Sequence, residues 1–170
     1  MDERKPIYLV VGVSGSGKSW ACRQAADRFH YIPHDRCWTH PDKEPWDPAF
    51  VWAADLGDDS HYLPGAKSNH LEVLIAAAQI AKKPVLTECP FGERLLREGL
   101  EAAGLRVIPI FVVEEPRLVA ERYFAREGKE LPKAAHTRAG SIGERAAEWE
   151  AFSGTSVEVL KFLKEVSLES

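Results

Sequence analysis

Residues 12–19 read Gly-Val-Ser-Gly-Ser-Gly-Lys-Ser and match the pattern G-x-x-x-x-G-K-S/T at every fixed position. The apolar, β-branched run at residues 7–11 precedes them and is typical of a buried parallel strand. Residues 18–29 follow with the spacing and composition of a helix. Glycines in such a turn let backbone N–H groups point at phosphate oxygens, and the helix adds its positive dipole end. The stretch therefore predicts a phosphate-binding loop between a strand and a helix.

The predicted loop assigns chemistry to two side chains in particular. Lys18 can reach the β- and γ-phosphates of a nucleotide, and the Ser19 hydroxyl can ligate Mg²⁺. Lys18 is also a predicted catalytic residue, because it neutralises charge that grows on a transferring phosphoryl group. The sequence thus predicts ATP and Mg²⁺ as cofactors, with nucleotide contacts from Gly12, Ser14, Gly15, Ser16, Gly17, Lys18 and Ser19.

Bulk composition favours one globular domain without a membrane partner. The 170 residues are 45% hydrophobic and 28% charged, which is ordinary for a domain with a full-sized core. The net charge of −4 argues against a generally basic nucleic-acid coat. The charged N-terminus lacks the apolar core of a signal peptide, and no apolar stretch approaches the ~20 residues of a membrane span. Three cysteines without regular spacing indicate a reducing cytoplasm.

Apolar runs alternate with helical patterns along the chain, which predicts an α/β fold in three αβα layers around a parallel sheet. We expect strands at residues 7–11, 31–33, 84–87 and 106–113, and a weak fifth strand at 149–152. We expect helices at 18–29, 69–82 with Ser68 as N-cap, 91–103, 117–127 and 156–166, a loop plus helix at 129–147, and a helical turn at 48–54. No linker divides the chain, so residues 1–170 are expected to form a single domain.

Two carboxylates follow predicted strands, at the edge where open parallel sheets bind ligands. Asp35 comes just after residues 31–33, where it can accept the proton of a substrate hydroxyl that attacks the γ-phosphate. Its alternative role is to cap a turn. Glu88 follows the apolar run 85–87, where a carboxylate can face Mg²⁺ directly or through water, or contact the substrate. The alternative for Glu88 is a solvated residue at a strand end.

The segment at residues 116–145 is basic in an otherwise acidic chain, with seven Lys or Arg against four Glu. Arg122 and Arg126 are four residues apart and share one helix face. Phosphoryl transfer needs cations that arrive as the site closes, so residues 117–145 are predicted to form an Arg-rich lid. Arg126 is the predicted catalytic arginine, and Arg122 is a predicted nucleotide contact. The alternative is a solvated helix face with Glu–Arg pairs.

These features together resemble the small P-loop kinases, a group that includes nucleoside monophosphate, shikimate, gluconate and polynucleotide 5′-hydroxyl kinases. The resemblance covers residues 7–161. It rests on the strand–loop–helix unit, on Asp35 after the second strand, on the run 111–116, and on Glu-Arg-Tyr-Phe-Ala-Arg-Glu-Gly-Lys at residues 121–129. It implies a P-loop NTPase fold with strand order 2-3-1-4-5, Asp35 as the general base and Arg126 as the lid arginine.

Residues 36–67 interrupt the alternation where these kinases bind substrate, so they are the predicted substrate-binding insertion. Trp38 and Trp46 lie in irregular sequence and are candidates for stacking on a nucleobase, although tryptophans also pack local cores. Residues 34–62 hold seven acidic and two basic side chains, which argues against a phosphate-tracking groove there. The predicted substrate contacts are Asp35, Trp38, Trp46 and Glu88.

The leading hypothesis is an ATP-dependent kinase that acts on a hydroxyl of a nucleic acid or nucleotide. Among the small P-loop kinases, the chain looks most like the polynucleotide-kinase-like branch. That branch resembles the kinases with which some phages phosphorylate hydroxymethyluracil in DNA. For a phage-encoded chain the compartment is the host cytoplasm. The alternatives are a small-metabolite kinase of the gluconate or shikimate kind and, from another class, an ATP-binding regulatory module. The spacing of His34, Cys37 and His40 also admits a zinc site if Cys89 lies nearby.

Overall fold

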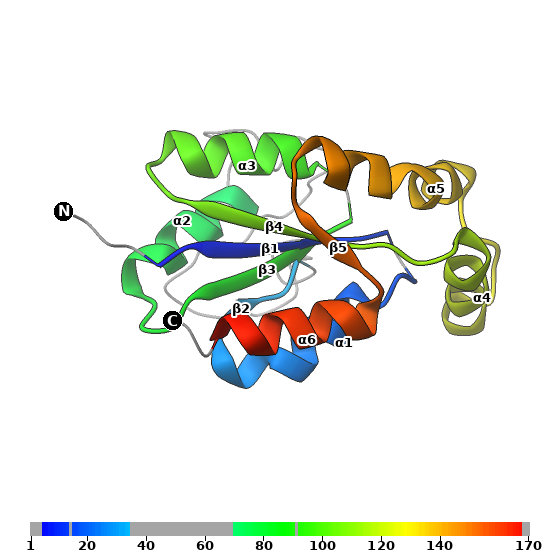
Figure 1. Cartoon of the computed structure of the whole chain (residues 1–170), viewed down its shortest axis with the longest axis horizontal. Helices are drawn as coiled ribbons and strands as arrows, with labels where there is room; N and C mark the ends of the chain where they lie inside the picture. The colour runs from blue at the N-terminus through cyan, green and yellow to red at the C-terminus, as the bar shows by residue number, and fades with distance from the viewer. Residues whose placement is uncertain (1–4, 14, 35–69, 91, 168–170) are drawn as a thin grey trace, which may run out of the picture.

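The computed structural model describes residues 5–13, 15–34, 70–90 and 92–167. At its centre is a sheet of five strands in the order β2-β3-β1-β4-β5 (Figure 1). Neighbouring strands are parallel throughout. The predicted α/β fold and the predicted strand order 2-3-1-4-5 are both confirmed. The strands are β1 (Ile7–Val11), β2 (His30–Ile32), β3 (Val85–Cys89), β4 (Val107–Val112) and β5 (Phe152–Gly154).

Helices cover both faces of the sheet and make it the middle of three layers (Figure 1). One face is covered by α2 (His70–Ile80), α3 (Glu93–Ala102) and α5 (Lys133–Glu148). The other is covered by α1 (Lys18–Ala25), which continues into a 3₁₀ turn (Ala26–Arg28), and by α6 (Ser156–Ser167). The remaining helix, α4 (Pro116–Glu127), stands beyond the carboxyl ends of the central strands.

The central strand β1 divides its side chains between two hydrophobic cores. Ile7, Leu9 and Val11 pack into the core that contains α2, α3 and α5. Tyr8 and Val10 pack against α1 and α6 on the opposite face. All five are buried, which explains why the run is apolar without alternation. Each such side chain contributes about 1.5–3 kcal/mol on burial.

Two glycines act as the helix stops that the sequence predicts. Gly104 and Gly128 have φ angles of 84° and 71°, in the left-handed region that favours glycine. The N–H of Gly128 donates to the carbonyl of Phe124 at 2.8 Å and closes α4.

Within the expected loop plus helix at 129–147, α5 begins at Lys133. Ser68 and the expected helical turn at 48–54 lie outside the described residues.

The position predicted for the fifth strand is wrong. The pattern places it at residues 149–152, whereas β5 spans Phe152–Gly154. Trp149 instead closes α5, because its N–H donates to the Arg145 carbonyl at 3.1 Å. Glu150 then turns the chain with a φ of 51° before the strand can pair with β4.

Among the described residues, every helix is too short or too polar to cross a membrane.

The start of α6 is held by a reciprocal capping box. The Glu158 N–H donates to Thr155 Oγ1 at 3.3 Å, and the Thr155 N–H donates to Glu158 Oε1 at 3.0 Å. These bonds lower the pKa of Glu158 below its ordinary value of 4.5, the Thr155 N–H having the larger effect. Because the folded-state pKa is lowered, this stabilisation is present above about pH 4.5 and is lost as the pH falls through the lowered value.

We predict that Thr155→Ala lowers the free energy of unfolding by about 1 kcal/mol at neutral pH, the usual cost of losing a helix N-cap. Urea denaturation measures the difference. Thr137→Ala is the matched control, since Thr137 is exposed in the second turn of α5. Alanine is a better helix former there, so this control should be neutral or stabilising. Equal destabilisation by the two variants would contradict the capping role of Thr155.

Candidate active site

The predicted phosphate-binding loop is wedged between α4 and α6. Gly15 and Gly17 have φ angles of 89° and 93°, which a side chain rarely adopts. A Cβ atom at Gly15 would lie 2.6 Å from the Val119 carbonyl oxygen of α4. At Gly17 it would lie 2.8 Å from the Cβ of Ser156, the first residue of α6. Glycine is therefore required at both positions by conformation and by packing.

A cavity of about 210 Å³ opens over this loop at the start of α1. It brings together Lys18, Ser19, Arg122 and Arg126, all of which the sequence assigns to the site. Among the described residues that line it, four carry positive charge, which suits a polyphosphate. The full lining is Gly15, Gly17, Lys18, Ser19, Trp20, Arg23, Arg122 and Arg126.

Two other predicted loop contacts lie behind this cavity. Gly12 and Ser16 are buried, and their N–H groups donate to protein carbonyls, those of Cys89 at 3.2 Å and Val13 at 3.0 Å. The first bond extends the pairing of β1 with β3 into the loop. Both residues therefore shape the loop from beneath. Ser14 lies outside the described residues.

A second cavity, of about 350 Å³, adjoins the first and shares Gly17, Trp20 and Arg122 with it. Its other walls are Ser156 and Val157 of α6. Trp20 and Val157 are unusual because they are large apolar side chains that remain exposed. An aromatic ring, an aliphatic side chain and a guanidinium together suit a flat aromatic group such as a nucleobase. No motif in the sequence assigns Trp20 or Val157 to a site, because each lies within an ordinary helical pattern.

Glu88 lies in direct contact with the Ser19 hydroxyl. Ser19 Oγ donates to Glu88 Oε1 at 2.5 Å, and the Tyr31 hydroxyl donates to Oε2 at 2.5 Å. Glu88 is only 3% exposed, so the alternative of a solvated residue at the strand end is wrong. The Glu88 carboxylate and the Ser19 hydroxyl offer the hard oxygen ligands that Mg²⁺ prefers, and the donor set fits this ion.

Burial determines the protonation of the groups around Glu88. Burial, and then the nearby Glu88 carboxylate, raise the pKa of Tyr31 far above its ordinary value, so this phenol remains a proton donor. The same two causes raise the pKa of Cys22, which packs as a neutral thiol on the inner face of α1. Tyr31 thus keeps one carboxylate oxygen of Glu88 occupied and leaves the other toward Ser19.

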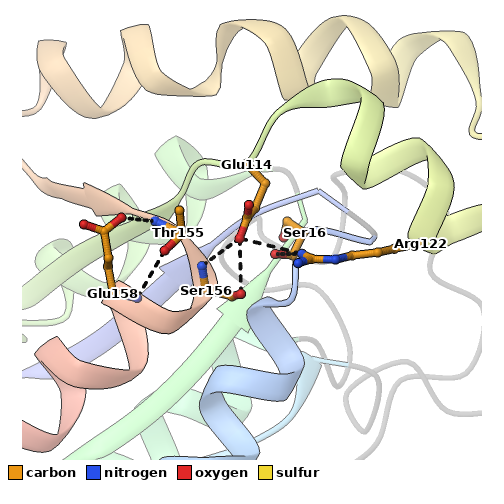
Figure 2. A network of polar contacts seen from close by, with 6 residues as sticks. All are labelled: Ser16, Glu114, Arg122, Thr155, Ser156 and Glu158. Carbon is orange, nitrogen blue, oxygen red and sulfur yellow. Dashed lines mark hydrogen bonds and ion pairs between the residues drawn. The ribbon is translucent and has the colours of Figure 1, made fainter.

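The two arginines on the shared face of α4 are held differently. The Arg122 guanidinium donates to the Ser16 carbonyl at 3.2 Å and lies 3.7 Å from Glu114 Oε1 (Figure 2). The side chain of Arg126 is 57% exposed and donates to its neighbour Glu127 at 3.0 Å. Arg122 is therefore anchored to the loop and the core, whereas Arg126 lines the cavity from the solvent side.

At the carboxyl ends of β2 and β3, buried polar side chains form a small network. His70 Nε2 lies 2.6 Å from Thr87 Oγ1, which itself donates to the Ile32 carbonyl at 2.8 Å. Since the threonine proton is used in that bond, His70 Nε2 is the donor to Thr87. The ring of His34 meets the ring of His70 edge-on, with centroids 5.2 Å apart. His70 and Thr87 are fully buried, so this network ties the start of α2 to β2 and β3.

Within the predicted lid, one arginine is a fixed anchor. Arg138 of α5 donates to the Pro90 carbonyl at 2.8 Å and forms an ion pair with Glu93, which is 2% exposed. Burial, and then the nearby Glu93, raise the pKa of the Cys89 thiol. The start of α5 is thus tied to the chain that leaves β3.

Asp35, Trp38 and Trp46 lie outside the described residues, as do Cys37 and His40 of the possible zinc site.

Several solved structures share this architecture. A gluconokinase from Sinorhizobium meliloti 1021 has a TM-score of 0.59 and 19% identity, over 99% of this chain and 97% of that one. The tunicamycin resistance protein of Deinococcus radiodurans has a TM-score of 0.58 and 15% identity, over 98% and 95%. A sugar kinase from Janibacter sp. HTCC2649 has a TM-score of 0.50 and 18% identity, over 92% and 91%. No protein-family model and no curated protein sequence matches the chain.

At these identities the likeness establishes the fold. The strand order, the glycine-rich loop after β1 and the helices on both faces agree with it. The chain therefore has the three-layer α/β fold of these solved structures.

Proposed function

We propose that this protein is an ATP-dependent kinase that transfers the γ-phosphoryl group to a hydroxyl. The observation that carries the proposal is the 210 Å³ cavity, in which Lys18 and three arginines surround the loop beside the Ser19–Glu88 pair. Phosphoryl transfer depends on positioned cations more than on covalent chemistry, and this cavity supplies them. The buried thiols of Cys22 and Cys89 are consistent with a cytoplasmic location.

The adjoining 350 Å³ cavity supports a nucleoside triphosphate as donor. Its walls of Trp20, Val157 and Arg122 suit the base, while the shared Gly17 leads to the phosphate cavity. Mg²⁺ held by Ser19 and Glu88 would supply charge neutralisation at the β- and γ-phosphates.

The proposed reaction is an in-line displacement. The acceptor oxygen forms a bond to the γ-phosphorus, the bond from that phosphorus to the bridging oxygen breaks, and ADP leaves. The hydroxyl proton passes to the carboxylate of Asp35, the base predicted from the sequence. Lys18 and Arg126 stabilise the charge on the transferring group.

For the acceptor, we propose a hydroxyl of a nucleic acid or nucleotide. The candidates within this class are a polynucleotide 5′-hydroxyl and hydroxymethyluracil in DNA. Support comes from the sequence, in which Trp38 and Trp46 offer stacking surfaces. A small polyol is the second candidate, because the Asp- and His-rich segment at residues 36–67 carries side chains that hydrogen-bond neutral hydroxyls.

A labelling panel tests the proposal. Purified protein is incubated with γ-labelled ATP, Mg²⁺ and DNA with or without hydroxymethyluracil, 5′-hydroxyl oligonucleotides, nucleotides, gluconate, shikimate and other polyols. Labelled DNA or nucleotide supports the leading acceptor, and a labelled polyol supports the second. Acceptor binding should weaken steeply with salt for DNA and hardly at all for a neutral polyol. ATP binding without transfer to any acceptor would instead indicate a regulatory module.

Arg126→Ala should lower kcat by about 10²–10³-fold while changing ATP affinity little, the range expected when one transition-state donor is removed. The reason is that Arg126 lines the phosphate cavity from the solvent side without an anchor to the loop. Arg117→Ala is the matched control, because Arg117 is an exposed arginine of α4 paired with Glu121 outside the cavity. A fall in ATP affinity alone would make Arg126 a binding residue.

A further inference from the structure

Glu114 is a buried carboxylate beside the proposed nucleotide site, and the reaction described above does not use it. It follows β4, and its side chain is only 8% exposed. Glu114 Oε1 accepts hydrogen bonds from the Ser156 N–H at 3.0 Å and from Ser156 Oγ at 3.2 Å. The same oxygen lies 3.7 Å from the guanidinium of Arg122 (Figure 2). One carboxylate oxygen thus joins the start of α6 to α4.

The partners of Glu114 form the walls of the 350 Å³ cavity. Ser156 and Arg122 both line it. They also meet the phosphate-binding loop, since a Cβ at Gly17 would lie 2.8 Å from Ser156 Cβ and 3.5 Å from Arg122 Nη1. Arg122 in turn donates to the Ser16 carbonyl. Loop, α4 and α6 therefore converge on this carboxylate, as Figure 2 shows.

Burying a carboxylate is costly unless its partners compensate, so its position calls for a reason. Arg122 provides that reason. Its side chain is 40% exposed and could extend into solvent, and the buried Glu114 carboxylate holds it against the loop instead. Among the described residues, Glu114 is the acidic partner of Arg122, and the other bond of the guanidinium goes to the neutral Ser16 carbonyl. Arg126, one turn further along α4, shows the contrast: its acidic partner is Glu127 on the same helix.

We infer that Glu114, itself held by Ser156, is a positioning residue of the nucleotide site, which fixes Arg122 against the loop and thereby sets the affinity for ATP. This inference rests on the proposed function. Glu114 acts through Arg122 and does not touch the reacting phosphoryl group. The shared face of α4 then carries two different arginines, one anchored for binding by Glu114 and one left to act in transfer.

The test is ATP binding by isothermal titration calorimetry, combined with the division of kinetic effects between KM and kcat. Glu114→Ala should weaken ATP binding about tenfold or more, the effect of losing hydrogen bonds to a charged group, and should raise KM with kcat within about threefold. Glu114→Gln should fall between wild type and Glu114→Ala, because the amide oxygen still accepts from Ser156 but carries no charge for Arg122. Glu115→Ala, at the neighbouring exposed carboxylate, is the control and should bind ATP like wild type.

A double-mutant cycle separates positioning of Arg122 from a general structural role. If Glu114 acts through Arg122, the variant with both Glu114→Ala and Arg122→Ala should bind ATP within about twofold of Arg122→Ala alone. Additive losses would overturn the inference. If Glu114→Ala fails to fold, the same cycle with Glu114→Gln decides the question. Wild type that binds no ATP would refute the proposed function, whereas equal ATP binding by wild type and folded Glu114 variants would refute only this inference.

Discussion

Lys18→Ala is expected to abolish phosphoryl transfer while the protein remains folded. Lys18 is the first residue of α1 and lines the cavity over the loop, where its ammonium can follow charge onto the γ-phosphoryl oxygens. That charge grows in the transition state, so the loss should appear mainly in kcat. Arg23, Arg122 and Arg126 remain in the variant and should preserve part of the ATP affinity.

The measurement is kcat with saturating ATP, supported by a thermal unfolding curve. Lys161→Ala is the matched control, since Lys161 is an exposed lysine of α6 outside the phosphate cavity, and it should retain wild-type kcat. Turnover by folded Lys18→Ala at a rate comparable to wild type would contradict the placement of the γ-phosphate over this loop.

Asp35→Asn is expected to lower kcat by roughly 10²–10⁴-fold while ATP affinity is retained, the range that follows the loss of a general base. An amide cannot accept the proton of the attacking hydroxyl, although it has nearly the shape of the carboxylate. The prediction comes from the sequence, because Asp35 follows β2 by three positions and lies outside the described residues.

The matched control for Asp35→Asn is Asp27→Asn, at an exposed aspartate in the turn after α1. Single-turnover rates and ATP binding should be measured for both variants. An unchanged kcat in Asp35→Asn would remove Asp35 from the mechanism and leave the acceptor proton to another group near the carboxyl ends of the strands.

Much of the fold was predictable because local signals agree with one another. The β-branched run at Ile7–Val11 is apolar throughout, as a strand covered on both faces must be. The spacing of Arg122 and Arg126 predicts a shared helix face, and both side chains line one cavity in the structure. Where local signals are weak, as in the three-residue strand β5, the prediction is displaced, because pairing with β4 determines the position of that strand.

The contacts of the site were less predictable, because they depend on pairing between distant segments. The register of β1 and β3 sets Val10 beside Glu88, and this brings Glu88 to Ser19 and Tyr31. No spacing in the sequence encodes that contact. A usable signal did exist for Glu114, since it follows β4 by two positions and Asp35 follows β2 by three, so both carboxylates lie just after parallel strands.

The central claim, transfer of the γ-phosphoryl group from ATP to a hydroxyl, is tested most directly by comparing ATP labelled at the γ-phosphate with ATP labelled at the α-phosphate. Both are incubated with the protein, Mg²⁺ and the acceptor panel, and the products are separated. We predict that the γ-label appears in a phosphate monoester of one acceptor and that the only labelled product from α-labelled ATP is ADP. Lys18→Ala should form neither product. ATP that binds tightly and is recovered with both labels in place, for every acceptor, would contradict the claim.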